Sequence, residues 1–475
     1  MSLSSLPVEL ISQVVEQLRV GTDNDTLKAL ARTSQALKAI AERHLYSSAV
    51  FTTCSQLHTL HEAVRAHPER GAYMRNLELP WSTRSFDYGS PFDPLDLCRL
   101  PNLTSFLSES PFCNALWSGE SAVLEGWNDV VRGYLDSFMQ ASLLTHPGPG
   151  GERPLKHLRH LTLHWTGDQD TRFWETTPFC PIFLLPTLRS LEISCVTIIS
   201  PPGPAGGWDS QLAGLSRQTN LKSLTLTRCS IAAESLVPIL SFPKALETFS
   251  ILEVLTGYAG SFNSSCITDN MDVFNAALAQ QSESLRRLQI RRSASPRRGS
   301  PSPFLSLELS NFRCLSQLNL GPHCDGPRGR WKLVEPVPPA LTTLCLLELW
   351  GKNVGGDGAS EFFSSFPVGQ LVANADARGV SFELDIGLAR GFPDRTQQSV
   401  DDFVSLLTSQ GILPAPASKR RVRFLTAQRV PFIPPYLYDE KKPYYKVRYD
   451  TSTSSGYVDA PDNSEPVDLD IGTGY

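Results

Sequence analysis

The chain of 475 residues lacks the features that mark several classes of protein. No apolar run approaches the roughly 18 residues that span a bilayer, so no membrane-spanning helix is expected. The charged residues, 43 Lys and Arg against 48 Asp and Glu, nearly balance, which disfavours general binding to nucleic acid or to an anionic membrane. Met1–Ser4 also lacks the basic start of a secretory signal. We therefore expect an intracellular protein, cytoplasmic or nuclear, that binds neither membrane nor nucleic acid.

Signs of catalysis and of metal binding are equally scarce. The ten cysteines are scattered without a C-x-x-C pair, which indicates reduced thiols rather than a disulfide framework. The sequence contains no G-x-S-x-G, no P-loop and no H-E-x-x-H. His157, His160 and His164 form one metal-like cluster, but on a strand His157 faces away from the other two. We expect no catalytic residue, no metal and no cofactor, and hence not an enzyme.

Helix breakers are nearly absent from the first part of the chain. Between Pro7 and Pro68 there is no proline, and Gly21 is the only glycine before Gly71. Three amphipathic helices are predicted, because apolar residues recur there at helical spacing and Ser34 suits the N-cap of the third. Their apolar positions are Leu10, Ile11, Val14, Val15 and Leu18, then Leu27, Leu30 and Ala31, then Leu37, Ile40, Ala41 and Leu45. So small a module cannot bury all of these side chains, which implies a partner or a neighbouring domain.

These residues resemble a known family. The run Leu6-Pro7-x-Glu9-Leu10-Ile11 and the positions that follow it, through His44-Leu45-Tyr46, look like an F-box over residues 4 to about 50. The resemblance implies docking onto a SKP-type adaptor of a cullin-based ubiquitin ligase. The residues expected to bind that adaptor are Leu6, Pro7, Glu9, Leu10, Ile11, Val14, Leu18, Leu27 and Leu30. The alternative is that the three helices only cap the downstream domain.

The pattern L-x-x-L-x-L recurs through the middle of the chain at intervals of 25 to 39 residues. Its copies begin at Leu158, Leu188, Leu221, Leu246, Leu285, Leu315 and Leu341, with an earlier copy at Met74 and a poor one at Leu103. The last two apolar positions of each copy alternate along a short strand and point inward, and the polar residues between them point outward. In the copy at Leu221, Cys229 occupies the position where leucine-rich repeats turn the chain. Stacked copies predict a parallel-strand solenoid with a concave binding surface.

Helices are expected between these strands. We place them at Ser235–Leu240, Met271–Gln281 and Glu361–Phe366, and an earlier one at Gln56–His67. The order of an F-box, a short helix and the strand Arg75-x-Leu77-x-Leu79 resembles fungal F-box proteins with a degenerate leucine-rich-repeat-like region. The resemblance favours a continuous body rather than two domains on a linker.

The insertions and the C-terminal part add further expectations. Pro201–Trp208, His146–Gly151 and Arg291–Pro303 are predicted to be surface loops, and Ser295, Ser300 and Ser302 in the last are candidate phosphorylation sites. A strand over Val380–Ile386, a helix over Val400–Leu407 and a strand over Arg421–Leu425 would close the solenoid. The acidic residues after 450 lack any Lys or Arg, which predicts a disordered tail.

The predicted fold class is therefore an α/β solenoid, in which a three-helix F-box-like module precedes an irregular leucine-rich-repeat-like horseshoe. The expected domains are the F-box-like module at 1–50, a helical linker at 51–72, the solenoid at 73–350, its C-terminal cap at 351–430 and a mostly disordered acidic tail at 431–475. The predicted function is that of a substrate-recognition subunit, which binds the SKP-type adaptor and cullin complex and an unidentified protein substrate. The alternative function is a non-catalytic leucine-rich-repeat scaffold.

Overall fold

The structure is a computed structural model. It describes residues 7–18, 24–80, 95–110, 127–145, 153–165, 174–199, 214–254, 267, 270–293, 305–321, 331–334, 336–346, 368–388, 400–401, 404–405, 407–409, 411–413, 420–429 and 444–452. The chain divides into two compact units. Unit 1 comprises Met1–Arg172 and Pro181–Leu191, and unit 2 comprises Phe173–Cys180 and Glu192–Tyr475.

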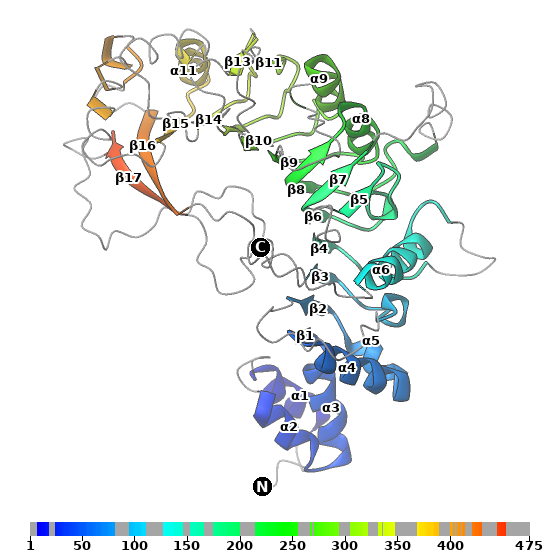
Figure 1. The fold of residues 1–475 in the computed structure, drawn as a ribbon. Coiled ribbons are helices and arrows are strands. Elements are labelled where there is room, and N and C mark those ends of the chain that lie inside the picture. The colour runs from blue at the N-terminus through cyan, green and yellow to red at the C-terminus, as the bar shows by residue number, and fades with distance from the viewer. Residues whose placement is uncertain are drawn as a thin grey trace, which may run out of the picture. The chain divides into compact units, whose positions relative to one another are not determined.

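Unit 1 begins with three helices and continues as strands that alternate with helices (Figure 1). Its elements are α1 (Val8–Glu16), α2 (Asn24–Ala31), α3 (Gln35–Leu45), β1 (Ser48–Val50), α4 (Cys54–Ala66), α5 (Pro68–Tyr73), β2 (Asn76–Leu79), η2 (Leu97–Arg99), β3 (Ser105–Glu109), α6 (Trp127–Ala141), β4 (His160–His164) and η3 (Pro181–Leu184). Strands β1, β2, β3 and β4 pair in parallel in that order. The strand β6 (Ser190–Ser194) begins in unit 1 and ends in unit 2.

Unit 2 repeats the same alternation. Its elements are β5 (Trp174–Thr176), β7 (Val196–Ile198), β8 (Ser223–Ile231), α8 (Ala233–Ser241), β9 (Thr248–Val254), α9 (Met271–Ala279), β10 (Arg287–Ser293), β11 (Leu305–Leu307), β12 (Gln317–Leu320), β13 (Trp331–Leu333), β14 (Thr343–Leu346), α11 (Val368–Ala377), β15 (Phe382–Leu388), β16 (Arg420–Arg429) and β17 (Tyr444–Asp450). From β8 to β16 the main strands pair in parallel, and β17 joins β16 antiparallel. The strand pair β11 and β13 forms a separate parallel sheet.

The predicted repeat pattern is confirmed as strands. Leu224, Phe249, Leu288, Leu318 and Leu344 occupy the same register on β8, β9, β10, β12 and β14, and each is fully buried. The apolar residue at the first position of each copy is also buried. Burying this column of apolar side chains is the main term that holds the stack together. The protein is thus an α/β protein of mostly parallel strands alternating with helices, an arrangement consistent with leucine-rich repeats.

The described helices match the predicted ones with shifted ends. Helix α8 covers the predicted Ser235–Leu240, and α9 covers most of Met271–Gln281. Residues 51–72, predicted as a helical linker, contain α4 and most of α5, which lie in the chain between the parallel strands β1 and β2. The predicted helix Glu361–Phe366 and the loops Pro201–Trp208 and His146–Gly151 lie outside the described residues.

The C-terminal expectations are met in part. Strands β15 and β16 contain the predicted strands, and the described residues within 400–409 are helical. Residues 444–450 were expected within the disordered tail, but they form the strand β17. Tyr449 packs edge-on against Phe424 of β16 with ring centroids 5.6 Å apart, and this contact explains the pairing. Residues 453–475 lie outside the described part of the chain.

Two details of the predicted repeat are wrong. The chain does not turn at Cys229, because β8 continues to Ile231 and accommodates a register shift between Thr227 and Cys229. Several of the polar positions that were expected to face outward are buried, notably Thr225, Gln289 and Asn319. Strands lie about 4.8 Å apart. At this spacing, polar side chains at the same register position on neighbouring strands shield one another from solvent.

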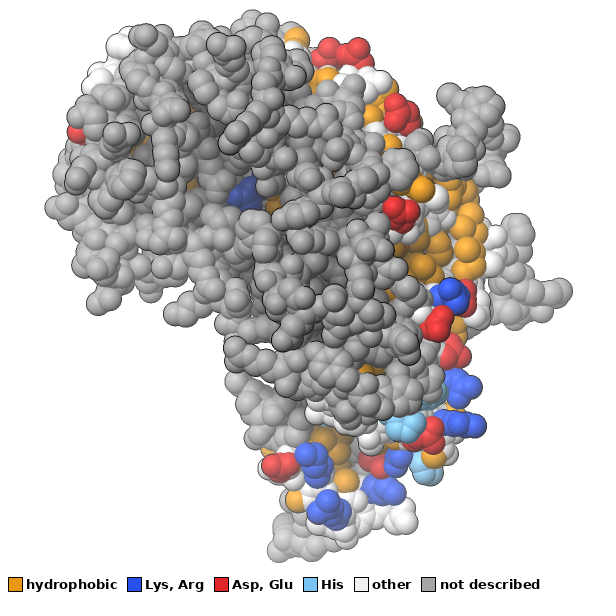
Figure 2. All heavy atoms as spheres, in the orientation of Figure 1, with side chains coloured by type: hydrophobic (Ala, Val, Ile, Leu, Met, Phe, Trp, Pro, Cys, Tyr) orange, Lys and Arg blue, Asp and Glu red, His pale blue; other side chains and the backbone are white. Residues whose placement is uncertain are grey.

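The described part of the chain can be examined for membrane-spanning helices and for the distribution of surface charge. None of the described helices is both long and apolar enough to cross a membrane. Over the described part of one face, Lys, Arg, Asp and Glu side chains are interspersed (Figure 2). This mixing agrees with the nearly balanced charge of the sequence.

Candidate protein-binding site

The three N-terminal helices form a small core of their own. Ile11 and Val15 of α1 pack with Leu27 of α2 and Leu37 of α3, and each is less than a tenth exposed. Ser34 accepts a hydrogen bond from the Leu37 amide at 3.2 Å and so caps α3, as the sequence predicts. The module therefore has a defined shape before any partner is considered.

The residues predicted to bind an adaptor divide into three groups. Pro7, Glu9, Leu10 and Val14 are exposed, and Leu18 and Leu30 are partly buried. Ile11 and Leu27 belong to the core of the module, so they support its shape rather than offer free surface. Leu6 lies outside the described residues.

Leu10 and Val14 stand out because they are apolar and open to solvent. Their side chains are 45% and 52% exposed, and they lie one turn apart on α1. Large apolar side chains exposed side by side commonly mark an interface. We call this surface, Leu10 and Val14 with the neighbouring Pro7, the α1 stripe.

A polar contact holds the module against the first repeat. The Arg70 guanidinium of α5 donates to Glu42 Oε1 of α3 at 2.8 Å, and both side chains are at least four-fifths buried. The same guanidinium lies 5.3 Å from the centre of the Tyr46 ring, which suits a cation–π contact. The sequence did not predict this contact, since nothing in the local patterns pairs residue 42 with residue 70.

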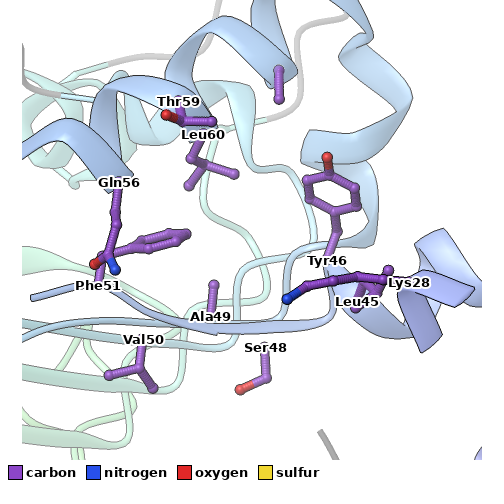
Figure 3. A pocket seen from close by; sticks show the side chains of 11 residues that line it. Lys28, Leu45, Tyr46, Ser48, Ala49, Val50, Phe51, Gln56, Thr59 and Leu60 are labelled. Atoms are coloured by element: carbon purple, nitrogen blue, oxygen red, sulfur yellow. The ribbon is translucent and has the colours of Figure 1, made fainter. Parts of the chain in front are cut away.

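A pocket of about 490 Å³ lies between β1, α4 and the ends of α2 and α3 (Figure 3). Ala49 of β1 and Phe51, the residue after the strand, point toward α4, and Leu60 and Tyr46 close the space above them. Among the described residues that line it, Lys28 alone is charged. The pocket is thus apolar with one cation at its margin.

A row of polar residues crosses the strands of unit 2. Thr225, Ser250, Gln289 and Asn319 lie at the same register on the neighbouring strands β8, β9, β10 and β12, and all are buried. The buried Cys345 of β14 comes next at this register, and Asp385 of β15 follows it. The row continues from Asp385 to Arg423, whose guanidinium donates two hydrogen bonds of 2.7 Å to the carboxylate. The hydrogen bond with Asp385 raises the pKa of Arg423, so the guanidinium stays charged.

A second ion pair joins the last two strands. Arg421 of β16 donates to both carboxylate oxygens of Asp450 of β17, the shorter contact being 2.6 Å. Burial alone would raise the pKa of Asp450, but hydrogen bonds from Arg421 and Ser452 outweigh it and hold that pKa below its usual value. The antiparallel strand is therefore fixed by charge as well as by its backbone ladder.

Two other buried ionisable groups have strongly shifted pKa values. Burial lowers the pKa of His164 to about 4 and raises that of Glu192 to about 7. His164 lies opposite the buried Glu109 in the ladder of β3 and β4, whereas His157 and His160 are exposed. The three histidines therefore do not converge. Within the described ranges no group of three or more His, Cys, Asp or Glu is placed to hold a metal ion.

The remaining predicted sites are only partly placed. Arg291 and Ser293 belong to β10, while Ser295, Ser300 and Ser302 lie outside the described residues. Seven cysteines fall in the described part of the chain as free thiols, and five of these are buried.

We compared the chain with protein-family models and with curated proteins. No protein-family model matches the chain, and a search of curated proteins finds no match.

Proposed function

We propose that this protein is the substrate-recognition subunit of a SKP-cullin-type ubiquitin ligase. The three-helix module binds the adaptor, and the repeat region binds a protein target. The chain carries no chemistry in this scheme, because other subunits transfer ubiquitin. It acts by raising the effective concentration of the target near the conjugating enzyme.

The α1 stripe is the observation that carries the proposal. The module already has a core, yet it leaves Leu10 and Val14 about half exposed on the helix that bears the F-box-like sequence. Two large apolar side chains exposed one turn apart are typical of an interaction surface. The contact between Glu42 and Arg70 fixes the module to the first repeat, as both this proposal and the cap alternative require.

The test is co-purification of a SKP-type adaptor with the full chain and with the variant Leu10→Asp/Val14→Asp. Two carboxylates on the apolar stripe would have to be desolvated on binding, so we expect adaptor recovery to fall by at least about tenfold. The matched control is Gln35→Asp/Ala39→Asp, which puts the same two charges at the same spacing on an exposed face of α3.

Two results would count against the proposal. One is undiminished adaptor recovery with the α1 variant, and the other is no adaptor recovery with the unaltered chain. The second result would favour the non-catalytic scaffold, in which the helices α1–α3 only cap the repeat region. Circular dichroism of both variants checks that the fold is unchanged.

A further inference from the structure

The strand β1 has one edge that no described strand of unit 1 covers. It pairs with β2 alone among the described strands. The Ser47 carbonyl accepts from the Asn76 amide at 3.0 Å, and the Phe51 amide donates to the Glu78 carbonyl at 2.9 Å. In a parallel ladder, alternate residues direct their backbone groups to opposite edges. Ser48 and Val50 therefore direct their N–H and C=O groups away from β2.

The pocket lies beside this same edge. Figure 3 shows Ala49 and Phe51 on the α4 side of β1, facing the space that Leu60 and Tyr46 border. A volume of about 490 Å³ falls in the range of binding pockets and is enough for a few side chains. An extended main chain laid along β1 would direct every second side chain into it.

The charge at the margin specifies the occupant further. The Lys28 amino group points toward the pocket and lies 3.0 Å from Asp25 Oδ1 (Figure 3). The Asp25 side chain is 99% exposed, so this ion pair contributes little and exchanges readily for another carboxylate. None of the described residues that line the pocket is acidic. An incoming carboxylate therefore meets a cation and no repulsion from the lining.

We propose that the free edge of β1 and this pocket together bind an extended segment of a partner protein, one face of which carries apolar side chains and a carboxylate. The segment adds a strand to β1 through hydrogen bonds with Ser48 and Val50. Its apolar side chains enter the pocket, and its carboxylate pairs with Lys28. This site goes beyond the proposed function, because binding here needs neither the α1 stripe nor an adaptor.

The probe is a blocked, fluorescein-labelled heptapeptide with valine at its first, third and seventh positions, glutamate at the fifth and threonine between them. We expect saturable binding to the full chain by fluorescence anisotropy. Antiparallel pairing directs the threonine amides to β1, whereas parallel pairing directs the valine and glutamate amides to it. We therefore compare one peptide with N-methyl groups on two threonine amides and another with N-methyl groups on the amides of the third and seventh residues. The one whose methylated amides face β1 should lose at least about tenfold in affinity, because it lacks donors for the ladder. That comparison leaves the protein unchanged. A peptide with lysine in place of glutamate should also bind several-fold more weakly.

Variants of the protein test the same two contacts. Val50→Pro removes an N–H that points away from β2, so it should weaken peptide binding about tenfold while circular dichroism stays unchanged. Lys28→Glu should weaken binding several-fold and favour the lysine peptide. The matched control is Lys38→Glu, an exposed lysine of α3 outside the pocket, which should change nothing.

The outcomes separate this proposal from the others. Unchanged binding of both N-methylated peptides, or of the lysine peptide, would overturn it, as would no saturation up to about 1 mM. Self-association of the chain that Val50→Pro abolishes would assign the edge to a second copy instead. Leu10→Asp/Val14→Asp should retain the peptide, and Lys28→Glu should retain the adaptor, so failure of one proposal is distinguishable from failure of the other.

Discussion

Units 1 and 2 share the same alternation of strands and helices, yet they differ in which side chains they expose to solvent. The large apolar side chains that are exposed in the described structure all belong to unit 1, namely Leu10, Val14, Val50, Met139 and Leu144. The described end of unit 2 is instead closed by the antiparallel β17 and by the ion pairs of Arg421 and Arg423. Unit 1 also contains buried charged groups, among them Glu109 and the pair of Glu42 and Arg70, so the two units differ in their exposed apolar side chains rather than in buried charge. Exposed apolar side chains are typical of interaction surfaces, which agrees with the binding surface proposed on α1.

Breaking the pair between Asp385 and Arg423 tests whether unit 2 depends on its buried charges. The two side chains are 4% and 13% exposed, so Arg423→Ala leaves a buried carboxylate without its partner. We expect the free energy of unfolding of unit 2 to fall by about 3–5 kcal/mol. Hydrogen exchange at the amides of β15 and β16 measures the loss where it occurs.

An exposed ion pair in the same unit supplies the control. Lys222 and Glu247 approach to 2.6 Å, but both side chains are over two-fifths exposed. Lys222→Ala should therefore cost less than about 1 kcal/mol. Equal losses for the two variants would show that burial of the charges in unit 2 has no energetic consequence.

The pH dependence of the two units should have opposite signs. His164 in unit 1 has a pKa lowered by burial from 6.5 to about 4, so the unfolded chain binds the proton first. Its contribution to stability is therefore lost as the pH falls from 6.5 toward 4. Glu192 in unit 2 has a pKa raised by burial from 4.5 to about 7. Its contribution is present below pH 4.5 and is lost as the pH rises toward 7.

Each loss is on the order of 3 kcal/mol, since one pKa unit corresponds to about 1.4 kcal/mol. Hydrogen exchange of each unit at several pH values between 4 and 8 measures the two slopes. His164→Gln should flatten the slope of unit 1 alone, and Glu192→Gln that of unit 2 alone. Slopes of the same sign in both units would contradict the prediction.

The sequence was sufficient for the repeated, local part of the fold. The apolar triplets that begin at Leu221, Leu246 and Leu285 became strands in register, because each needs only its neighbour to bury its side chains. The three helices and the cap at Ser34 followed from spacing in the same way. Patterns that repeat within a few residues are thus enough to place such elements.

Contacts between residues far apart in the chain could not be predicted from the sequence. The burial of Gln289 and Asn319 depends on neighbouring strands that lie about 30 residues apart in the chain. In the candidate site, the sequence predicted the stripe of α1 but could not tell that Ile11 turns inward while Leu10 stays exposed. The pocket beside β1 joins three helices and a strand, so no single stretch of sequence indicates it.

The smallest predicted effect concerns the contact that fixes the module to the first repeat. Arg70→Ala removes a charged hydrogen bond to Glu42 and the contact with the Tyr46 ring. Both charged side chains are still partly exposed to solvent, so we expect the free energy that holds the module to the first repeat to fall by about 1–3 kcal/mol. Hydrogen exchange at the α3 and α5 amides should rise, while the strands β8–β10 of unit 2 stay protected.

The reversed pair Glu42→Arg/Arg70→Glu is the control, because it restores opposite charges and should recover part of the protection. Arg99→Ala removes an arginine from an exposed pair with Asp96 and should leave α3 and α5 unchanged. If Arg70→Ala also left them unchanged, the module would be held by its apolar contacts alone. The pair of Glu42 and Arg70 would then contribute nothing measurable to the junction, in contrast with the buried pair of Asp385 and Arg423 in unit 2.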